Sequence, residues 1–369
     1  MHTPNPSVRN TASPGPRPDR HPPASCAARS LLLAASLVGA LVGCKPADHE
    51  AAFRDAAARP VMLQMHRERD ALSAEPLRAL TPTEAAAPDV LVSLGQRLYH
   101  DVRLSGDGTV ACASCHDIAK GGDDGLKTST GIKGATGPIN APTVLNSAFN
   151  FRQFWDGRAA TLADQAKGPV TNPLEMGAAW PAVIAKLEQD AHYRQAFEAA
   201  FGDPAVNEDR IATAIARFEE TLITPAPFDR FLLGEADAIS ADAKRGYALF
   251  KNYGCVACHQ GVNIGGNLYQ KFGALQAAFE IQTDVDKGRQ NVTQNAADAG
   301  VFKVPSLRNV AMTAPYFHIG TVDKLVDAVR VMGSSQLGRT IPDDEIALIV
   351  EFLRSLTGEA PQLATAAQN

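Results

Sequence analysis

Apolar residues recur at helical spacing along much of the chain, and the alternation typical of β-strands is scarce. In residues 207–223 and 343–356 apolar side chains return every three or four positions, which predicts two amphipathic helices. Their apolar faces consist of Ile211, Ile215, Phe218 and Leu222 in the first helix and of Ile346, Ile349, Val350, Leu353 and Leu356 in the second. Long segments without this pattern, 117–150 and 260–310, need something other than helices to pack on. We therefore predict a mainly α-helical fold with long loops.

A weak internal repeat indicates what these loops pack on. A short amphipathic segment that starts at Gly95 precedes Cys-Ala-Ser-Cys-His at 112–116. A similar segment that starts at Gly246 precedes Cys-Val-Ala-Cys-His at 255–259. Each half of the chain thus contains an amphipathic helix that runs into the same five-residue pattern.

Cys-x-x-Cys-His is the sequence that attaches haem c, because the two thiols bind the vinyl groups and the histidine ligates the iron. A four-cysteine zinc site or a redox dithiol would need no histidine directly after each pair. We therefore predict two covalently attached haem c groups. Their binding residues are Cys112, Cys115 and His116 in the first half and Cys255, Cys258 and His259 in the second.

Composition and charge limit the class of protein. The 369 residues suffice for two or three domains. A hydrophobic share of 45% excludes a disordered chain. The net charge of −5 does not suggest a nucleic-acid partner, since such proteins usually carry a concentrated basic patch.

The N-terminal residues resemble an export signal. Residues 31–43 form an apolar run that is too short to span a bilayer but fits a signal peptide. This run ends at Leu41-Val42-Gly43-Cys44, which resembles the lipobox of bacterial lipoproteins; a plain signal peptide cut nearby is the alternative. We expect residues 1–43 to be a lipoprotein signal peptide and 44–88 a tether. The mature protein is then periplasmic and anchored to a membrane only through lipid on Cys44.

Sequence spacing leaves the sixth ligand of each haem iron open. The spacing from the motif histidines makes Met176 and Met332 the candidates for this ligand. Met332 also lies on an apolar helical stripe, so a methionine that only fills the core is an equal alternative.

From about residue 91 to residue 357 the chain resembles the bacterial di-haem cytochrome c peroxidases. The resemblance is carried by the ordered segments 140–146, 153–159, 165–170, 175–177, 254–259 and 305–318. It implies two cytochrome c-like domains. Residues 89–229 would hold the peroxidatic haem, and residues 230–369 the electron-transfer haem together with a C-terminal helix.

The resemblance also implies an activity and partners. Such a protein reduces hydrogen peroxide to water with electrons from a small cytochrome c or cupredoxin, which enter at the second haem. The family is commonly dimeric. Met332 falls where the electron-transfer haem of the family has its axial methionine, and a thioether ligand raises the potential as a receiving haem requires.

Catalytic residues carried over from the family lie in the first half. Glu175 matches the distal glutamate and Gln165 the glutamine beside it, which argues against Met176 as a ligand. A carboxylate over the iron can move a proton between the two peroxide oxygens. Trp155 matches the tryptophan between the haems, where it either relays an electron or fills space.

Further residues match positions between the two haem domains. Asn140, Thr313 and Pro315 match residues that bind calcium in the family, a hard cation that prefers oxygen ligands. Arg308 and His318 are candidate haem-propionate or interface partners, with a structural salt link as the alternative for each.

One loop departs from the family. Many members carry a histidine in the segment that corresponds to 128–139, and it caps the peroxidatic haem until the second haem is reduced. Counting back from Asn140 places Ile132 at this position, and no histidine occurs between His116 and His192. We therefore expect an open first iron, with Lys133 or Met176 as the competing caps.

Two other functions remain open at this point. One is that of the related di-haem enzyme that matures a tryptophan-derived quinone cofactor, which also lacks the capping histidine. That enzyme uses a tyrosine on the second haem, and Met332 argues against it. The other is a non-catalytic electron carrier, in which Glu175 and Gln165 would be incidental.

Overall fold

The fold was analysed in a computed structural model that describes residues 75–81, 89–278 and 283–361. The expected signal peptide, Cys44 and most of the tether lie outside the described residues. None of the described helices is long and apolar enough to cross a membrane.

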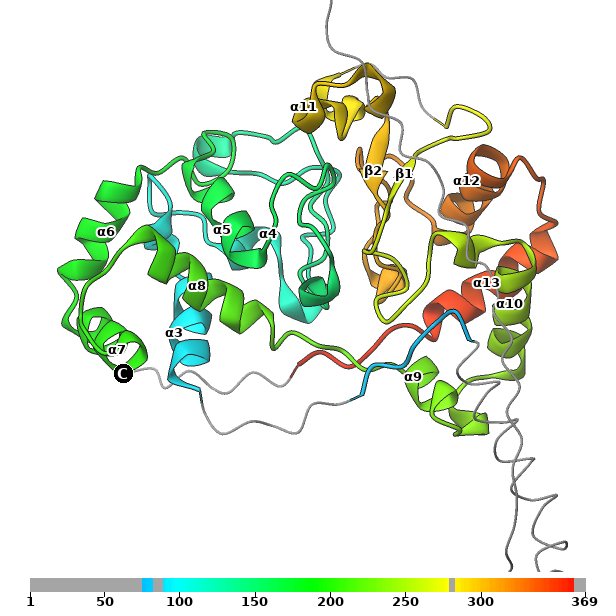
Figure 1. The fold of residues 1–369 in the computed structure, drawn as a ribbon, viewed down its shortest axis with the longest axis horizontal. Helices are drawn as coiled ribbons and strands as arrows, with labels where there is room; N and C mark the ends of the chain where they lie inside the picture. Colours follow the sequence, from blue (N-terminus) through cyan, green and yellow to red (C-terminus); the bar gives the residue numbers. More distant parts are fainter. Residues whose placement is uncertain (1–74, 82–88, 279–282, 362–369) are drawn as a thin grey trace, which may run out of the picture. The chain divides into compact units, whose positions relative to one another are not determined.

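Helices dominate the first half of the described chain (Figure 1). They are α3 (Val90–Tyr99), α4 (Cys112–Cys115), α5 (Leu162–Thr171), α6 (Trp180–Glu188), α7 (Ala191–Phe201) and α8 (Glu208–Glu219). The helix expected in 207–223 is α8, and Asn207 caps its first turn by accepting from Arg210 N. Residues 117–150 contain only short 3-10 turns, among them η3 (Ile132–Gly134).

The second half contains helices and one small sheet. Its elements are α9 (Pro227–Leu232), α10 (Ala241–Asn252), η6 (Cys255–Ala257), β1 (Tyr269–Lys271), η7 (Asp284–Lys287), α11 (Gln290–Thr293), β2 (Val301–Lys303), α12 (Leu325–Leu337) and α13 (Asp343–Arg354). Strands β1 and β2 pair antiparallel, with Tyr269 opposite Lys303. The helix expected in 343–356 is α13. The mainly helical fold is confirmed.

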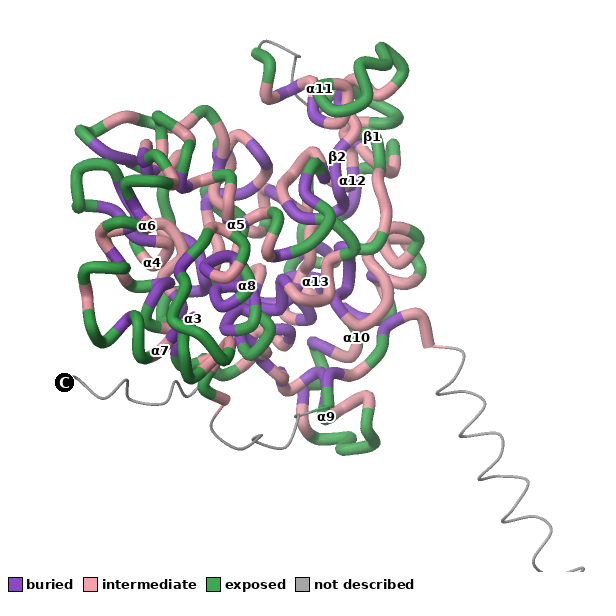
Figure 2. The backbone as a smooth tube through the Cα atoms, turned by 60° about the vertical axis from the view of Figure 1, so that its left-hand side comes forward, coloured by how far each residue is buried: buried purple, intermediate pink, exposed green. Residues whose placement is uncertain are grey.

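Two separate clusters of buried apolar side chains form the core. The first draws on residues between 94 and 222, and the second on Leu77 and residues between 228 and 356. Figure 2 shows buried positions running along α8, whose apolar face packs on α3. In the second cluster α10 packs on α13. The domain boundary expected at 229/230 stays a prediction.

The repeated glycines lie where these helix pairs touch. A Cβ atom on Gly95 in α3 would lie 1.8 Å from the carbonyl oxygen of Ala214 in α8. A Cβ atom on Gly246 in α10 would lie 1.9 Å from the carbonyl oxygen of Leu348 in α13. Each glycine therefore lets two helix backbones approach closely just before the Cys-x-x-Cys-His sequence.

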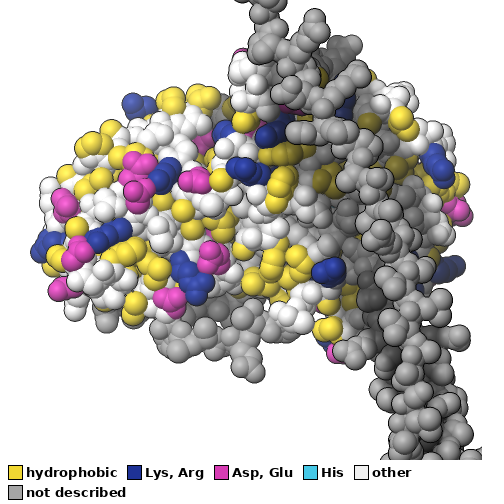
Figure 3. All heavy atoms as spheres, in the orientation of Figure 1, with side chains coloured by type: hydrophobic (Ala, Val, Ile, Leu, Met, Phe, Trp, Pro, Cys, Tyr) yellow, Lys and Arg dark blue, Asp and Glu magenta, His cyan; other side chains and the backbone are white. Residues whose placement is uncertain are grey.

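The surface carries charges of both signs. Figure 3 shows Lys and Arg side chains next to Asp and Glu side chains on the face in view. The ion pairs include Arg103–Asp101, at 2.7 Å, and Arg210–Asp203, at 2.6 Å.

Replacing Gly246 with alanine should destabilise the protein, because the backbone oxygen of Leu348 cannot rotate away from the new methyl group. We expect the free energy of unfolding to fall by about 1–3 kcal/mol, the usual cost of overpacking. Urea unfolding of the holoprotein measures this. Gly137→Ala is the control, since nothing lies within 4 Å of a Cβ atom there. Equal stability of the two variants would contradict the close-approach argument.

Candidate functional site: two cavities beside the Cys-x-x-Cys-His sequences

The first Cys-x-x-Cys-His sequence forms the one-turn helix α4 and the residue after it. Tyr99, from the end of α3, donates its hydroxyl hydrogen to the carbonyl oxygen of His116 at 2.7 Å. The Nδ1 atom of His116 lies 3.3 Å from the carbonyl oxygen of Gly122. Burial lowers the pKa of His116, so the ring stays neutral at pH 7 and can ligate a metal. A backbone contact to one ring nitrogen leaves the other for the iron.

The second sequence folds as η6 followed by Cys258 and His259. Burial lowers the pKa of His259 to about 4, which again keeps the imidazole neutral. The four cysteines are free thiols. Burial raises the pKa of Cys112 to about 12 and that of Cys255 to about 11. A raised pKa keeps a thiol protonated at pH 7, whereas a reactive redox dithiol needs a lowered one.

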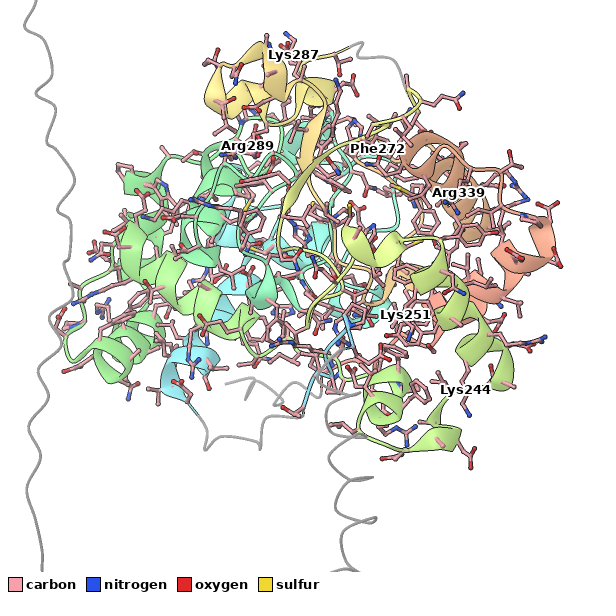
Figure 4. The ribbon with its side chains drawn as sticks, turned by 45° about the vertical axis from the view of Figure 1, so that its right-hand side comes forward. Lys244, Lys251, Phe272, Lys287, Arg289 and Arg339 are labelled. Atoms are coloured by element: carbon pink, nitrogen blue, oxygen red, sulfur yellow. The ribbon has the colours of Figure 1, made fainter. Side chains whose placement is uncertain are left out.

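A cavity of about 240 Å³ lies beside the second sequence. Its walls include Cys255, Cys258, His259 and, from α12, Met332. The neutral histidine and the thioether thus share one apolar cavity with the two thiols. This set of donors fits a covalently attached haem with histidine and methionine as candidate iron ligands. Phe272, which follows β1, also lines the cavity and lies toward α12 (Figure 4).

A smaller cavity of about 50 Å³ lies beside the first sequence. Cys112, Cys115 and His116 line it together with the two expected catalytic residues, Gln165 from α5 and Glu175. The fold therefore brings Gln165 and Glu175 to the first haem-attachment site. Met176 lines the same cavity and belongs to the first core cluster.

One side-chain and one backbone hydrogen bond hold Glu175 in place. The side chain of Asn172 donates to Glu175 Oε1 at 2.6 Å, and the carbonyl oxygen of Glu175 accepts from Ile132 N at 2.8 Å. Burial raises the pKa of the Glu175 carboxyl, while the hydrogen bond from Asn172 opposes this. The carboxyl group therefore keeps a proton to higher pH than an exposed glutamate would.

Trp155 connects the two halves. Its Nε1 donates to the carbonyl oxygen of Asn140 at 3.0 Å, and its carbonyl oxygen accepts from Lys303 N in β2 at 2.8 Å. Its ring lies 6.3 Å from that of His318, between ring centroids. Arg289, the residue that precedes α11, reinforces this junction by donating to the carbonyl oxygen of Asp156 at 3.3 Å (Figure 4).

The three expected calcium ligands line the large cavity together. Asn140, Thr313 and Pro315 come from segments far apart in the sequence. Asn140 Nδ2 donates to Leu126 O at 2.9 Å, and its N–H donates to the carbonyl oxygen of His318 at the same distance. Across residues 75–81, 89–278 and 283–361, no cluster of three or more His, Cys, Asp or Glu side chains could hold a metal ion. Calcium is not shown, and it stays a prediction.

Arg308 forms a buried ion pair outside both cavity walls. It lines neither cavity, and its two terminal nitrogens donate to the carboxylate of Asp229 at 2.8 and 2.9 Å. Both side chains are fully buried, with exposed fractions of 0% and 1%. Arg308 therefore makes the structural salt link that was the alternative for it, and a haem contact by this residue stays a prediction. His318 does line the large cavity, where its Nε2 lies 3.0 Å from Asp286 Oδ1.

Sequence reasoning missed two buried charged groups in the cavity walls. Glu219, in α8, lines the small cavity, and its Oε2 has no hydrogen-bond partner among the described residues. Lys303 lines the large cavity. Both sites had a signal: Glu219 lies four residues after Ile215 on the apolar face of a helix, and Lys303 lies between Phe302 and Val304.

Two Cys-x-x-Cys-His sequences, each beside its own cavity with a buried neutral histidine, define a di-haem c-type protein. A family model described as di-haem cytochrome c peroxidase matches residues 89–237. The cytochrome c551 peroxidase of Nitrosomonas europaea is 47% identical over 288 residues, which cover 78% of this chain and 84% of that protein. The cytochrome c551 peroxidase of Pseudomonas aeruginosa is 44% identical over 275 residues, which cover 73% and 79%.

A solved structure gives the same result for the fold. The crystal structure of a MauG-like protein associated with microbial copper homeostasis superimposes with a TM-score of 0.66 at 28% identity, covering 78% of this chain and 95% of that one. The chain belongs to the di-haem cytochrome c peroxidase family. It is a peroxidase enzyme with two haem c groups, which sets aside the electron-carrier alternative.

Removing one pair of thiols should remove one haem. In Cys255→Ser with Cys258→Ser, the only attachment site beside the large cavity is lost while the first sequence is untouched. We expect the mass of the purified wild-type chain to exceed its peptide mass by two haem groups, and that of the double variant by one. Mass spectrometry of the denatured proteins measures both. An unchanged haem count in the variant would contradict the assignment.

Proposed function

We propose that this peroxidase reduces hydrogen peroxide at the small cavity and takes its electrons from a small periplasmic cytochrome c or cupredoxin at the large one. The observation that carries the proposal is the placement of Glu175 and Gln165 in one cavity with His116, Cys112 and Cys115. The attached haem supplies an iron that binds peroxide and passes electrons to it. The balance is one peroxide, two electrons and two protons giving two waters.

Glu175 supplies the proton transfer. Its carboxylate takes the proton from the peroxide oxygen nearest the iron and returns it to the far oxygen, which then leaves as water. Gln165 can hold the far oxygen through its side-chain amide. The carboxyl has to be ionised to accept the first proton, and burial raises its pKa. The catalytic efficiency therefore falls as the pH decreases through this raised pKa.

Met332 and Trp155 support the proposed direction of electron flow. A soft thioether raises the reduction potential of a haem, and this suits the half that receives electrons. Trp155 lies at the junction of the two halves and lines the large cavity. Met332 also stands where the quinone-maturing enzyme would have a tyrosine, which argues against that alternative although both lack the capping histidine.

The remaining finer assignments are also proposals. Asn140, Thr313 and Pro315 offer amide and carbonyl oxygens in one place, as a calcium ion requires. The lipobox-like sequence supports a periplasmic protein that is anchored through Cys44. The family resemblance supports a homodimer.

Glu175→Gln should lower peroxide turnover by about 10²-fold or more, because a neutral amide cannot carry the proton. Both haems should stay attached, since Glu175 contributes no thiol or iron ligand. Steady-state oxidation of a reduced small cytochrome c by peroxide measures the rate. Glu198→Gln, an exposed position in α7, is the matched control. Full activity in Glu175→Gln would remove the proton-transfer role.

The oxidised enzyme should react with peroxide without prior reduction. Ile132 is buried beside Glu175 and Gly177 and has no atom that can ligate iron, so no histidine has to leave the small cavity. We expect optical and electron paramagnetic resonance spectra of the oxidised protein to show one high-spin haem, and turnover to start without a lag. Two low-spin haems, with activity only after reduction, would mean that Lys133 or Met176 caps the iron.

A further inference from the structure

Lys303 is a buried cation in the wall of the large cavity. It is the last residue of β2 and only 7% exposed. Its neighbours in the chain, Phe302 and Val304, are buried and line the same cavity. The backbone around it is fixed, because Lys303 N donates to the carbonyl oxygen of Trp155 and the residue pairs with Tyr269 in the β1–β2 sheet.

The ammonium group of Lys303 has no partner in the described part of the chain. No hydrogen bond or ion pair joins it to another described residue, and burial alone lowers its pKa to about 8. Burying an unpaired charge is costly, so buried lysines are rarely found without an anion. The contrast with Arg308 is clear: that buried cation has the carboxylate of Asp229 at 2.8 Å.

Neither of two nearby carboxylates, Asp286 and Asp123, forms an ion pair with Lys303. Asp286 Oδ1 lies 3.0 Å from His318 Nε2, and its Oδ2 accepts from the backbone and side chain of Thr283. Asp123 lines the cavity, but it forms no ion pair with Lys303. Because no carboxylate among the described residues pairs with Lys303, we consider the occupant of the cavity as the source of an anion.

The group attached at Cys255 and Cys258 carries such an anion. Haem has two propionate carboxylates, and they lie on the ring edge opposite the vinyl groups that the thiols bind. The thiols follow α10, whereas Lys303 comes from β2, which lies between α10 and the elements of the first half (Figure 1). Lys303 and the thiols thus line the same cavity from different elements of the fold, which suits a contact with a propionate.

We propose that Lys303 binds a propionate of the haem attached at Cys255 and Cys258 and thereby raises the reduction potential of that haem. A cation beside the haem stabilises the state that has gained an electron. Lys303 and the thioether of Met332 would both raise the reduction potential of this haem. Its backbone link to Trp155 places this charge at the junction of the two halves.

Spectroelectrochemical titration of the holoprotein tests the proposal independently of turnover. In Lys303→Met we expect the equilibrium constant for reduction of the second haem to fall about tenfold. This lowers its reduction potential by about 59 mV for one electron. Lys303→Arg keeps the charge and should stay within about twofold of the wild type. Lys271→Met is the matched control, because Lys271 lines the same cavity but is exposed.

Four results would overturn the proposal. An unchanged potential in Lys303→Met would mean that no propionate depends on this charge. An equal shift of the potential in Lys271→Met would show a general effect of surface charge. A shift of the first haem's potential alone in Lys303→Met would show that Lys303 contacts the first haem and not the second. If Lys303→Met fails to retain the second haem, Lys303→Arg decides: retention supports the charge contact, and failure of both variants shows that only packing matters.

Discussion

Protein interiors are close-packed, yet this chain encloses a cavity of about 240 Å³ directly beside one of its two Cys-x-x-Cys-His sequences. The covalent attachment of a large flat group at these sequences is the constraint on which the rest depends. It accounts for the little regular structure in 117–150 and 260–310, because residues of both segments line the large cavity. It also explains the two glycines at the helix crossings, because α3 and α10 have to lie close to their partners to deliver each sequence to its cavity.

Different polar side chains give the two cavities different chemistry. The small cavity contains the carboxyl group of Glu175, which can transfer protons, and the amide of Gln165, which can hydrogen-bond a polar substrate. The large cavity contains a thioether and a buried ammonium group, Met332 and Lys303, and both favour a reduced haem. One repeated structural unit thus carries two sets of side chains, and the proposed function assigns substrate reduction to the first and electron intake to the second. Trp155 and the β1–β2 sheet keep the two halves in register.

Much of this could be predicted from the sequence, for identifiable reasons. Periodicity indicated α8 and α13 because each presents one apolar face to neighbouring helices, α8 to α3 and α5, and α13 to α10 and α12. The motif spacing indicated the haem sites because thiol and imidazole chemistry is local. Partners far apart in the sequence could not be identified in this way: the sequence left a haem contact and a salt link open for Arg308, and it could not identify Asp229, 79 residues away, as the partner. Glu219 and Lys303 were missed because their roles arise from burial, which depends on the tertiary fold.

The central claim is that Met332 ligates the second haem iron, whereas no side chain of the small cavity occupies the sixth position of the first iron. Proton NMR of the fully reduced holoprotein tests this most directly, because a methionine bound to a low-spin iron has its methyl resonance shifted far upfield by the ring. The account predicts one such resonance, and its loss in Met332→Ala. Two resonances would show that Met176 closes the first iron as well, and none in the wild type would show that Met332 is a core residue; either result would contradict the account.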